Sequence, residues 1–104
     1  MSKLKFYFHP EALIDIEDAM EYYQGISVDL PTKFFVELQQ YIDTICLHPK
    51  IFKKQYDCRR VTLPSFPYIM YYRMQSDYIE ILGIFHGYKK PSQTQKSVIT
   101  RKKK

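Results

Sequence analysis

The chain has 104 residues, of which 45% are hydrophobic and 16% aromatic, and its formal net charge is +5. This length suffices for one domain with a modest core, and the chain is too apolar to be disordered overall. No run approaches the roughly 20 apolar residues of a membrane span, and the N-terminus lacks the apolar core of a signal peptide, so we expect a soluble, cytoplasmic protein. Cys46 and Cys58 lack the spacing of a zinc site, and no metal or cofactor is expected.

The positive charge is distributed unevenly. Seven basic residues and no acidic residue lie between Lys89 and Lys104, which leaves residues 1–88 with nine basic and eleven acidic side chains. Residues 11–21 carry five acidic side chains and no basic one, whereas residues 50–60 carry five basic side chains and one acidic one. Such segregation is typical of a protein with one side that faces a polyanion, although runs of charge are also common on solvated faces.

A short strand at 3–8 is the first predicted element, and two amphipathic helices follow it. In the first helix Pro10 suits the first turn and Gly25 suits the end; in the second, Asp29 is a candidate N-cap and Pro49 ends the helix. Because few residues join the two helices, they should pack antiparallel. The expected apolar stripes are Leu13, Ile16, Met20 and Tyr23, then Phe34, Phe35, Leu38, Tyr41, Ile42 and Ile45.

Three strands are predicted after Pro49, at 58–63, 67–74 and 78–86. Alternation in the first places Cys58, Arg60 and Thr62 on one side and Arg59 on the other, and the last strand is nearly all apolar, as in the centre of a sheet. We therefore expect an α+β fold of order β-α-α-β-β-β, with a small, mainly antiparallel sheet, a two-helix hairpin on one face, and the other face free to bind.

The end of the chain is predicted to differ from the rest. Residues 1–91 form the expected domain, and residues 92–104 have little apolar surface to bury. We expect them to form a basic, flexible C-terminal tail. A solubilising role and a contact with nucleic acid are equally compatible with its terminal lysines.

Four segments, in this order, resemble the RelE/ParE family of toxins from bacterial type II toxin-antitoxin systems, known also from plasmid stabilization. The segments are EALIDIEDAMEYY, FFVELQQYIDTICLHP, RRVTLPSFPYIMYYRM and DYIEILGIFHGYKKP, and the resemblance covers residues 3–91. It implies a toxin that a cognate antitoxin protein neutralises, with operator DNA bound only through the antitoxin complex. RelE-like toxins cut messenger RNA on the ribosome and ParE-like toxins inhibit DNA gyrase, and both targets stay open here.

The segment IFHGYKK, at the end of the last strand, carries three candidate catalytic residues: His86, Tyr88 and Lys89. Arg60 and Arg73 lie on the neighbouring strands. RNA cleavage without a metal needs a base, an acid and cations that stabilise the phosphorane. Histidine suits the proton transfer near neutral pH, and arginine or lysine suits the charge. A structural or surface role for His86, and a solvated strand charge for Arg73, explain these residues equally well.

Compared with RelE-like nucleases, this chain lacks part of the expected catalytic set. RelE-like nucleases have basic residues where this chain has Ile69 and Thr62. The alternatives are therefore a metal-independent endoribonuclease (mRNA interferase), a gyrase inhibitor, and a non-toxic, degenerate member that acts as an antitoxin-binding, DNA-associated regulatory module. A nuclease would use Arg60 and Arg73 for the phosphate, and His86 with Tyr88 or Lys89 for proton transfer.

Overall fold

Five strands and three helices follow one another along residues 3–103, the part of the chain that the computed structural model describes. The elements are β1 (Lys5–Phe8), α1 (Pro10–Gln24), α2 (Leu30–Leu47), β2 (Lys53–Gln55), β3 (Cys58–Thr62), β4 (Tyr68–Gln75), β5 (Tyr78–His86) and α3 (Pro91–Lys102). The strands form one sheet in the order β1-β5-β4-β3-β2, in which β1 runs parallel to β5 and the other neighbours are antiparallel. The predicted fold class and order are confirmed, with β2 and α3 in addition.

The two helices of the hairpin begin and end close to the predicted residues. α1 begins at Pro10, and the Nδ1 atom of His9 accepts a hydrogen bond from the backbone N–H of Glu11 at 3.1 Å. Gly25 caps the end of α1. α2 follows Asp29, whose side chain makes no capping bond, and it ends at Leu47, two residues before Pro49.

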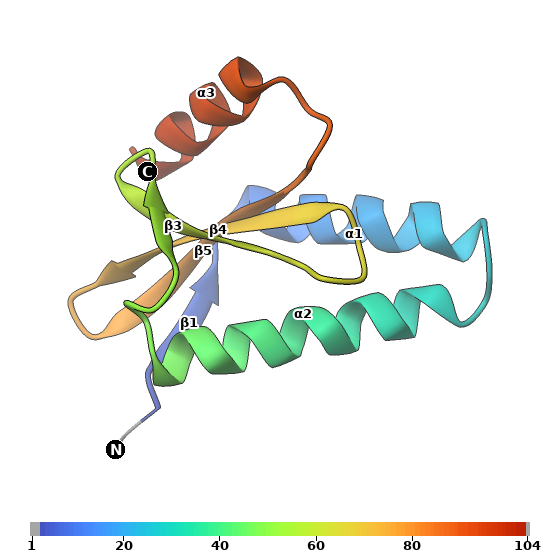
Figure 1. Ribbon diagram of the computed structural model, residues 1–104, viewed down its shortest axis with the longest axis horizontal. Helices are drawn as coiled ribbons and strands as arrows, with labels where there is room; N and C mark the ends of the chain where they lie inside the picture. The colour runs from blue at the N-terminus through green and yellow to red at the C-terminus, as the bar shows by residue number, and fades with distance from the viewer. Residues whose placement is uncertain (1–2, 104) are drawn as a thin grey trace.

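The main core lies between this hairpin and one face of the sheet (Figure 1). The stripe of α1 differs from the prediction, because Leu13 is 46% exposed and the small residues Ala12 and Ala19 are buried in its place. Phe35 of α2 is also partly exposed, next to the fully buried Phe34. The buried residues of this core are Ala12, Ile16, Ala19, Tyr23, Phe34, Leu38, Ile42, Ile45, Cys46, Val61, Leu63, Phe66, Met70, Tyr72, Ile79, Ile81 and Ile84.

α3 packs on part of the other face of the sheet, so the prediction of a flexible C-terminal tail is wrong, and the second face is not free as a whole. Figure 1 shows α3 on the side of the sheet opposite α2. Val98 of α3 is fully buried and packs in a second cluster with Cys58, Tyr71, Leu82 and Phe85. α3 has little other apolar surface, and its remaining buried side chains, Thr94 and Arg101, are polar.

A β-bulge in β5 allows this strand to place side chains in both hydrophobic clusters, one on each face of the sheet. Tyr71 of β4 faces Gly83, but the next residue, Tyr72, faces Ile81, so Leu82 has no partner on β4. A bulged strand bends and re-aims its side chains. Leu82 consequently packs under α3, whereas Ile81 and Ile84 pack in the main core.

Candidate functional site

A buried ion pair closes the edge of β5 next to the candidate site. The register of β1 with β5 ends at Phe8 and Ile81, so β5 has no strand neighbour on that side beyond this point. Asp15 of α1 accepts a hydrogen bond from the Ile84 N–H at 3.1 Å, and Arg101 of α3 donates to the Leu82 carbonyl at 3.0 Å. The two side chains thus satisfy backbone groups that a strand would otherwise pair.

Asp15 and Arg101 also bind each other. Two guanidinium nitrogens meet the two carboxylate oxygens at 2.6 and 3.2 Å, and the side chains are only 18% and 9% exposed. Gly83 makes this approach possible, because a Cβ atom there would collide with both groups. The Asp15–Arg101 pair therefore ties α1, β5 and α3 together. The sequence gives one indication of it, a glycine inside an apolar strand.

His86 stands at the end of β5, opposite Tyr68 of β4. Its ring meets the Tyr68 ring edge-on at 5.4 Å and lies 5.2 Å from the Tyr88 ring. The Nδ1 atom of His86 accepts a hydrogen bond from the Tyr88 N–H at 3.2 Å. A neutral imidazole that accepts at Nδ1 carries its proton on Nε2, so Nε2 is the atom available to a ligand as a donor.

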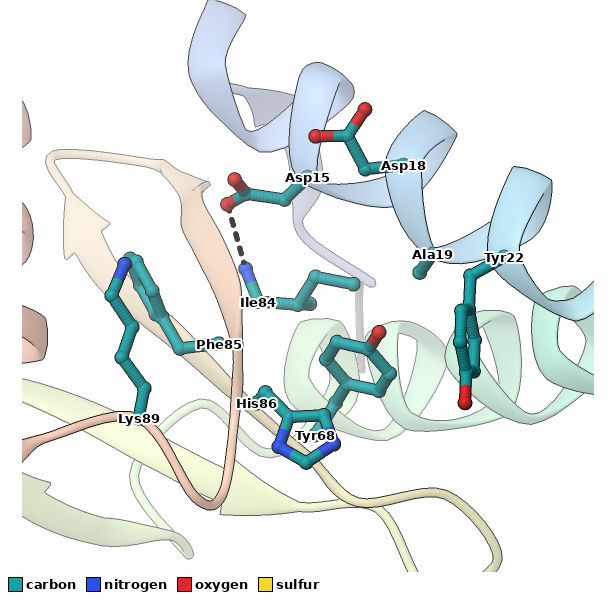
Figure 2. Close-up of a pocket in the computed structure, with 9 residues that line it drawn as sticks. All are labelled: Asp15, Asp18, Ala19, Tyr22, Tyr68, Ile84, Phe85, His86 and Lys89. Carbon is teal, nitrogen blue, oxygen red and sulfur yellow. Dashed lines mark hydrogen bonds between the residues drawn. The ribbon is translucent and has the colours of Figure 1, made fainter.

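Two clefts meet at His86, and Phe85, His86 and Lys89 line both of them. The first cleft has a volume of about 460 Å³ and lies between α1 and the ends of β4 and β5. Figure 2 shows it with the Asp15–Ile84 hydrogen bond on one side and the His86 ring beside Tyr68. The second cleft, of about 170 Å³, lies between α3 and the sheet, on the side of Arg60.

Oxygen atoms dominate the α1 side of the first cleft. Asp15, Asp18 and Tyr22 come from α1, and Tyr68 comes from β4. Burial raises the pKa of the Tyr68 phenol, and the nearby Tyr22, Asp18 and Asp15 raise it further. Tyr68 is therefore a neutral hydroxyl near pH 7 and can donate a hydrogen bond to a ligand.

Basic side chains without carboxylates line the second cleft. Arg60, His86 and Lys89 contribute to its wall, and none of its lining residues is acidic. Arg59 points elsewhere, because its guanidinium donates to the Lys50 and Phe52 carbonyls at 3.1 and 2.8 Å. The structure thus brings together three of the five candidate residues, Arg60, His86 and Lys89.

Arg73 lies apart from the other candidates. It faces Glu80 across the β4–β5 ladder, and its Nε atom donates to the Glu80 carboxylate at 2.7 Å. It lies five positions along β4 from Tyr68, the partner of His86, which is roughly 16 Å along a strand. Arg73 is therefore neutralised and cannot reach a phosphate held at His86.

Tyr88 is 89% exposed and lies in the loop that follows His86. Its backbone fixes the His86 ring, as described above, while its phenol stands in solvent. Among residues 3–103, no three His, Cys, Asp or Glu side chains form a group that could hold a metal ion. None of the helices in this part of the chain is long and apolar enough to cross a membrane.

The fold and the family can be assigned by comparison with known proteins. The fold matches a solved structure described as "Chromosomal ParDE TA system from P. aeruginosa", with a TM-score of 0.70 and 16% sequence identity. The match covers 81% of this chain and 96% of that one, so the fold is ParE-like. Comparison with curated protein sequences gives no match.

Residues 6–91 match the family described as "ParE toxin of type II toxin-antitoxin system, parDE". The chain therefore belongs to the ParE toxin family. The match ends at Pro91, the first residue of α3. It contains Arg60, His86 and Lys89 but not Arg101.

Proposed function

We propose that the chain is the toxin of a type II toxin-antitoxin pair and that it arrests growth by inhibiting DNA gyrase. Its membership of the ParE family, matched over residues 6–91, carries this proposal. A cognate antitoxin protein would neutralise it, and its targets would place its action in the cytoplasm. The antitoxin is expected to offer a helix or strand with acidic residues, which complements the basic side of the toxin.

The arrangement of charges supports inhibition by binding rather than RNA cleavage. A cutting site needs several cations around one phosphate, and Arg73 is paired with Glu80 at the other end of β4. Thr62 and Ile69, which lack the basic groups of RelE-like nucleases, face each other across the β3–β4 ladder. Among residues 3–103, Arg60 and Lys89 are the cations that line a cleft with His86. His86 therefore lacks the cations that a nuclease would have at Arg73, Thr62 and Ile69.

The test is induction of the chain in a bacterium, with wild type compared with His86→Gln and with His48→Gln. His48 is an exposed histidine at the end of α2 and provides the matched control. We expect growth arrest with gyrase-dependent DNA breaks in all three strains, and loss of supercoiling by purified gyrase when the protein is added. Messenger RNA cuts on the ribosome that disappear with His86→Gln would overturn the proposal in favour of a nuclease.

Normal growth at high expression would also overturn it, and would favour the non-toxic regulatory module. In that case the chain, purified with its antitoxin, should bind operator DNA without affecting gyrase. The two failures differ in growth and in RNA integrity, so a single induction experiment separates them.

A further inference from the structure

Arg60 differs from the other three arginines of the chain in having no partner among the described residues. Arg59 donates to two backbone carbonyls, Arg73 to Glu80, and Arg101 to Asp15. The Nε atom of Arg60 is enclosed and has no hydrogen-bond acceptor. Arg60 as a whole is only partly buried and lines a cleft, and its terminal guanidinium nitrogens make no hydrogen bond within residues 3–103. These donors can bind an acceptor that comes from outside the chain.

The second cleft is where such an acceptor can bind. Arg60 faces Tyr71 across the β3–β4 ladder, and both line the cleft with His86 and Lys89. Tyr71 donates its hydroxyl to Gln55 at 3.3 Å and so does not compete for an acceptor with Arg60. No carboxylate lines this cleft, and its positive groups have no counterion among residues 3–103.

The start of α3 adds to the positive character of this cleft. Pro91 and Thr94, from the first turn of the helix, lie in its wall, and Thr94 is buried. The N-terminus of a helix carries a partial positive charge. Pro91 has no N–H, and the Gln93 and Thr94 N–H groups donate to the Lys90 carbonyl at 3.0 and 3.1 Å, so the start of α3 contributes charge rather than these donors. With a volume of about 170 Å³, the cleft has room for about six water molecules at ~30 Å³ each, which is enough for a phosphate group.

We propose that the second cleft binds a phosphate group, with Arg60 as its principal ligand and His86 and Lys89 as supporting donors. A guanidinium with its flat array of donors suits phosphate oxygens, and a dianion matches several cations better than a single carboxylate does. The site binds the anion and makes or breaks no bond. The phosphate is either free or the terminal phosphate of a nucleic-acid strand. This inference is independent of the gyrase proposal.

The experiment is a titration of the full chain with sodium phosphate, followed by NMR of the arginine Nε–H groups. The four arginines give four such signals, and the Arg60 signal is the one that Arg60→Gln removes. We expect the Arg60 signal to shift in a saturable way, while the Arg73 signal stays in place. A parallel titration with potassium chloride at the same ionic strength controls for screening.

Three variants make the assignment specific. Arg60→Gln should weaken phosphate binding, followed on the backbone signals of the cleft, by roughly tenfold or more, the effect of one charge-assisted hydrogen bond. Arg60→Lys should keep part of the affinity. Lys96→Gln removes the same charge from an exposed residue of α3 outside the cleft and should leave the affinity unchanged.

A short single strand with a 5′-terminal phosphate separates the two sources of the anion. If it competes with inorganic phosphate and the same strand without the phosphate does not, the natural ligand is a nucleic-acid end. If neither strand competes, the site takes free phosphate. The proposal is overturned if wild type shows no saturable shift, or if Arg60→Gln binds phosphate as well as wild type does. Neither result bears on whether the chain arrests growth.

Discussion

The two faces of the sheet are covered by layers that are held in different ways. The hairpin of α1 and α2 packs through a continuous apolar core that includes the fully buried Phe34. α3 packs through a cluster of five buried residues, of which only Val98 is its own, and through the Asp15–Arg101 pair. Buried apolar area dominates stability, whereas a buried ion pair often adds little net stability because its desolvation offsets the attraction. We therefore expect the α3 layer to open more easily than the main core.

The boundary between these layers is also the boundary of the family match. Residues 6–91 contain all of the main core, and α3 begins at the last matched residue. The apolar layer thus carries the ParE fold. The polar layer is an addition to the matched region that shapes the second cleft.

The two cysteines report on the two layers separately. Cys46 is buried in the main core, and Cys58 is buried in the cluster under α3. Burial raises the pKa of both thiols, to about 11 for Cys58. Each is therefore a protonated, unreactive thiol at neutral pH until its layer opens and its pKa returns towards the ordinary value. The rate of alkylation at each cysteine measures the opening of its layer.

The largest effect should come from the main core. Phe34→Ala removes a fully buried aromatic side chain and should lower the free energy of unfolding by about 3 to 5 kcal/mol. Urea denaturation measures this loss, and alkylation of both cysteines should accelerate. Phe35→Ala, at the neighbouring half-exposed position, is the control and should cost less than half as much. Equal losses for the two variants would contradict the placement of Phe34, rather than Phe35, in the main core.

A more selective effect is expected at the Asp15–Arg101 pair. Asp15→Ala leaves the Arg101 guanidinium buried without its carboxylate, and α3 can undock to return that charge to water. We expect alkylation of Cys58 to accelerate by roughly tenfold, which corresponds to a loss of about 1.4 kcal/mol in the docking free energy of α3. The alkylation rate of Cys46 should not change. Asp18→Ala removes an exposed acid of the same helix and should change neither rate. Equal acceleration at both cysteines would mean that the layers open together.

The smallest effect should come from Lys102, at the end of α3. Its Nζ atom donates to the Tyr56 and Asp57 carbonyls at 3.1 Å each, in a turn whose two residues have positive φ angles of 56° and 59°. Lys102→Met should accelerate alkylation of Cys58 less than Asp15→Ala does. Added salt should reduce the difference from wild type, because the Asp57 carboxylate that pairs with Lys102 is fully exposed and the pair is screened. Lys103→Met is the control. An effect larger than that of Asp15→Ala would place the main attachment of α3 at this turn.

Regular patterns made most of the apolar layer predictable. The spacing of Ile16 and Tyr23 and of Phe34 and Leu38 identifies the two helices, and the alternation of β3 separates Val61 from Arg60. The buried alanines of α1 were missed because periodicity arguments rely on large side chains, whereas small ones allow close packing of the helix.

The polar layer was less predictable, for physical reasons. α3 has little apolar surface, and its docking depends on Arg101, whose partner Asp15 is 86 positions away in sequence. No local pattern records such a pair. The bulge opposite Tyr71, which turns Leu82 towards α3, has no local pattern either. Arg73 looked like a free strand cation because its partner, Glu80, becomes a neighbour only once the hairpin register is known.

α3 is joined to the sheet by the chain at Pro91 and is held near its other end by the Asp15–Arg101 pair. It can therefore act as a lever that turns about Pro91. The pivot lies at Pro91, beside the cleft of Arg60, and the far end lies at Lys102, beside Cys58. Twelve helical residues give this lever a length of about 18 Å. Once the Asp15–Arg101 pair is broken, a small rotation at Pro91 would displace the Lys102 end much further than the Pro91 end. We therefore expect undocking of α3 to widen the Arg60 cleft and to expose Cys58 together.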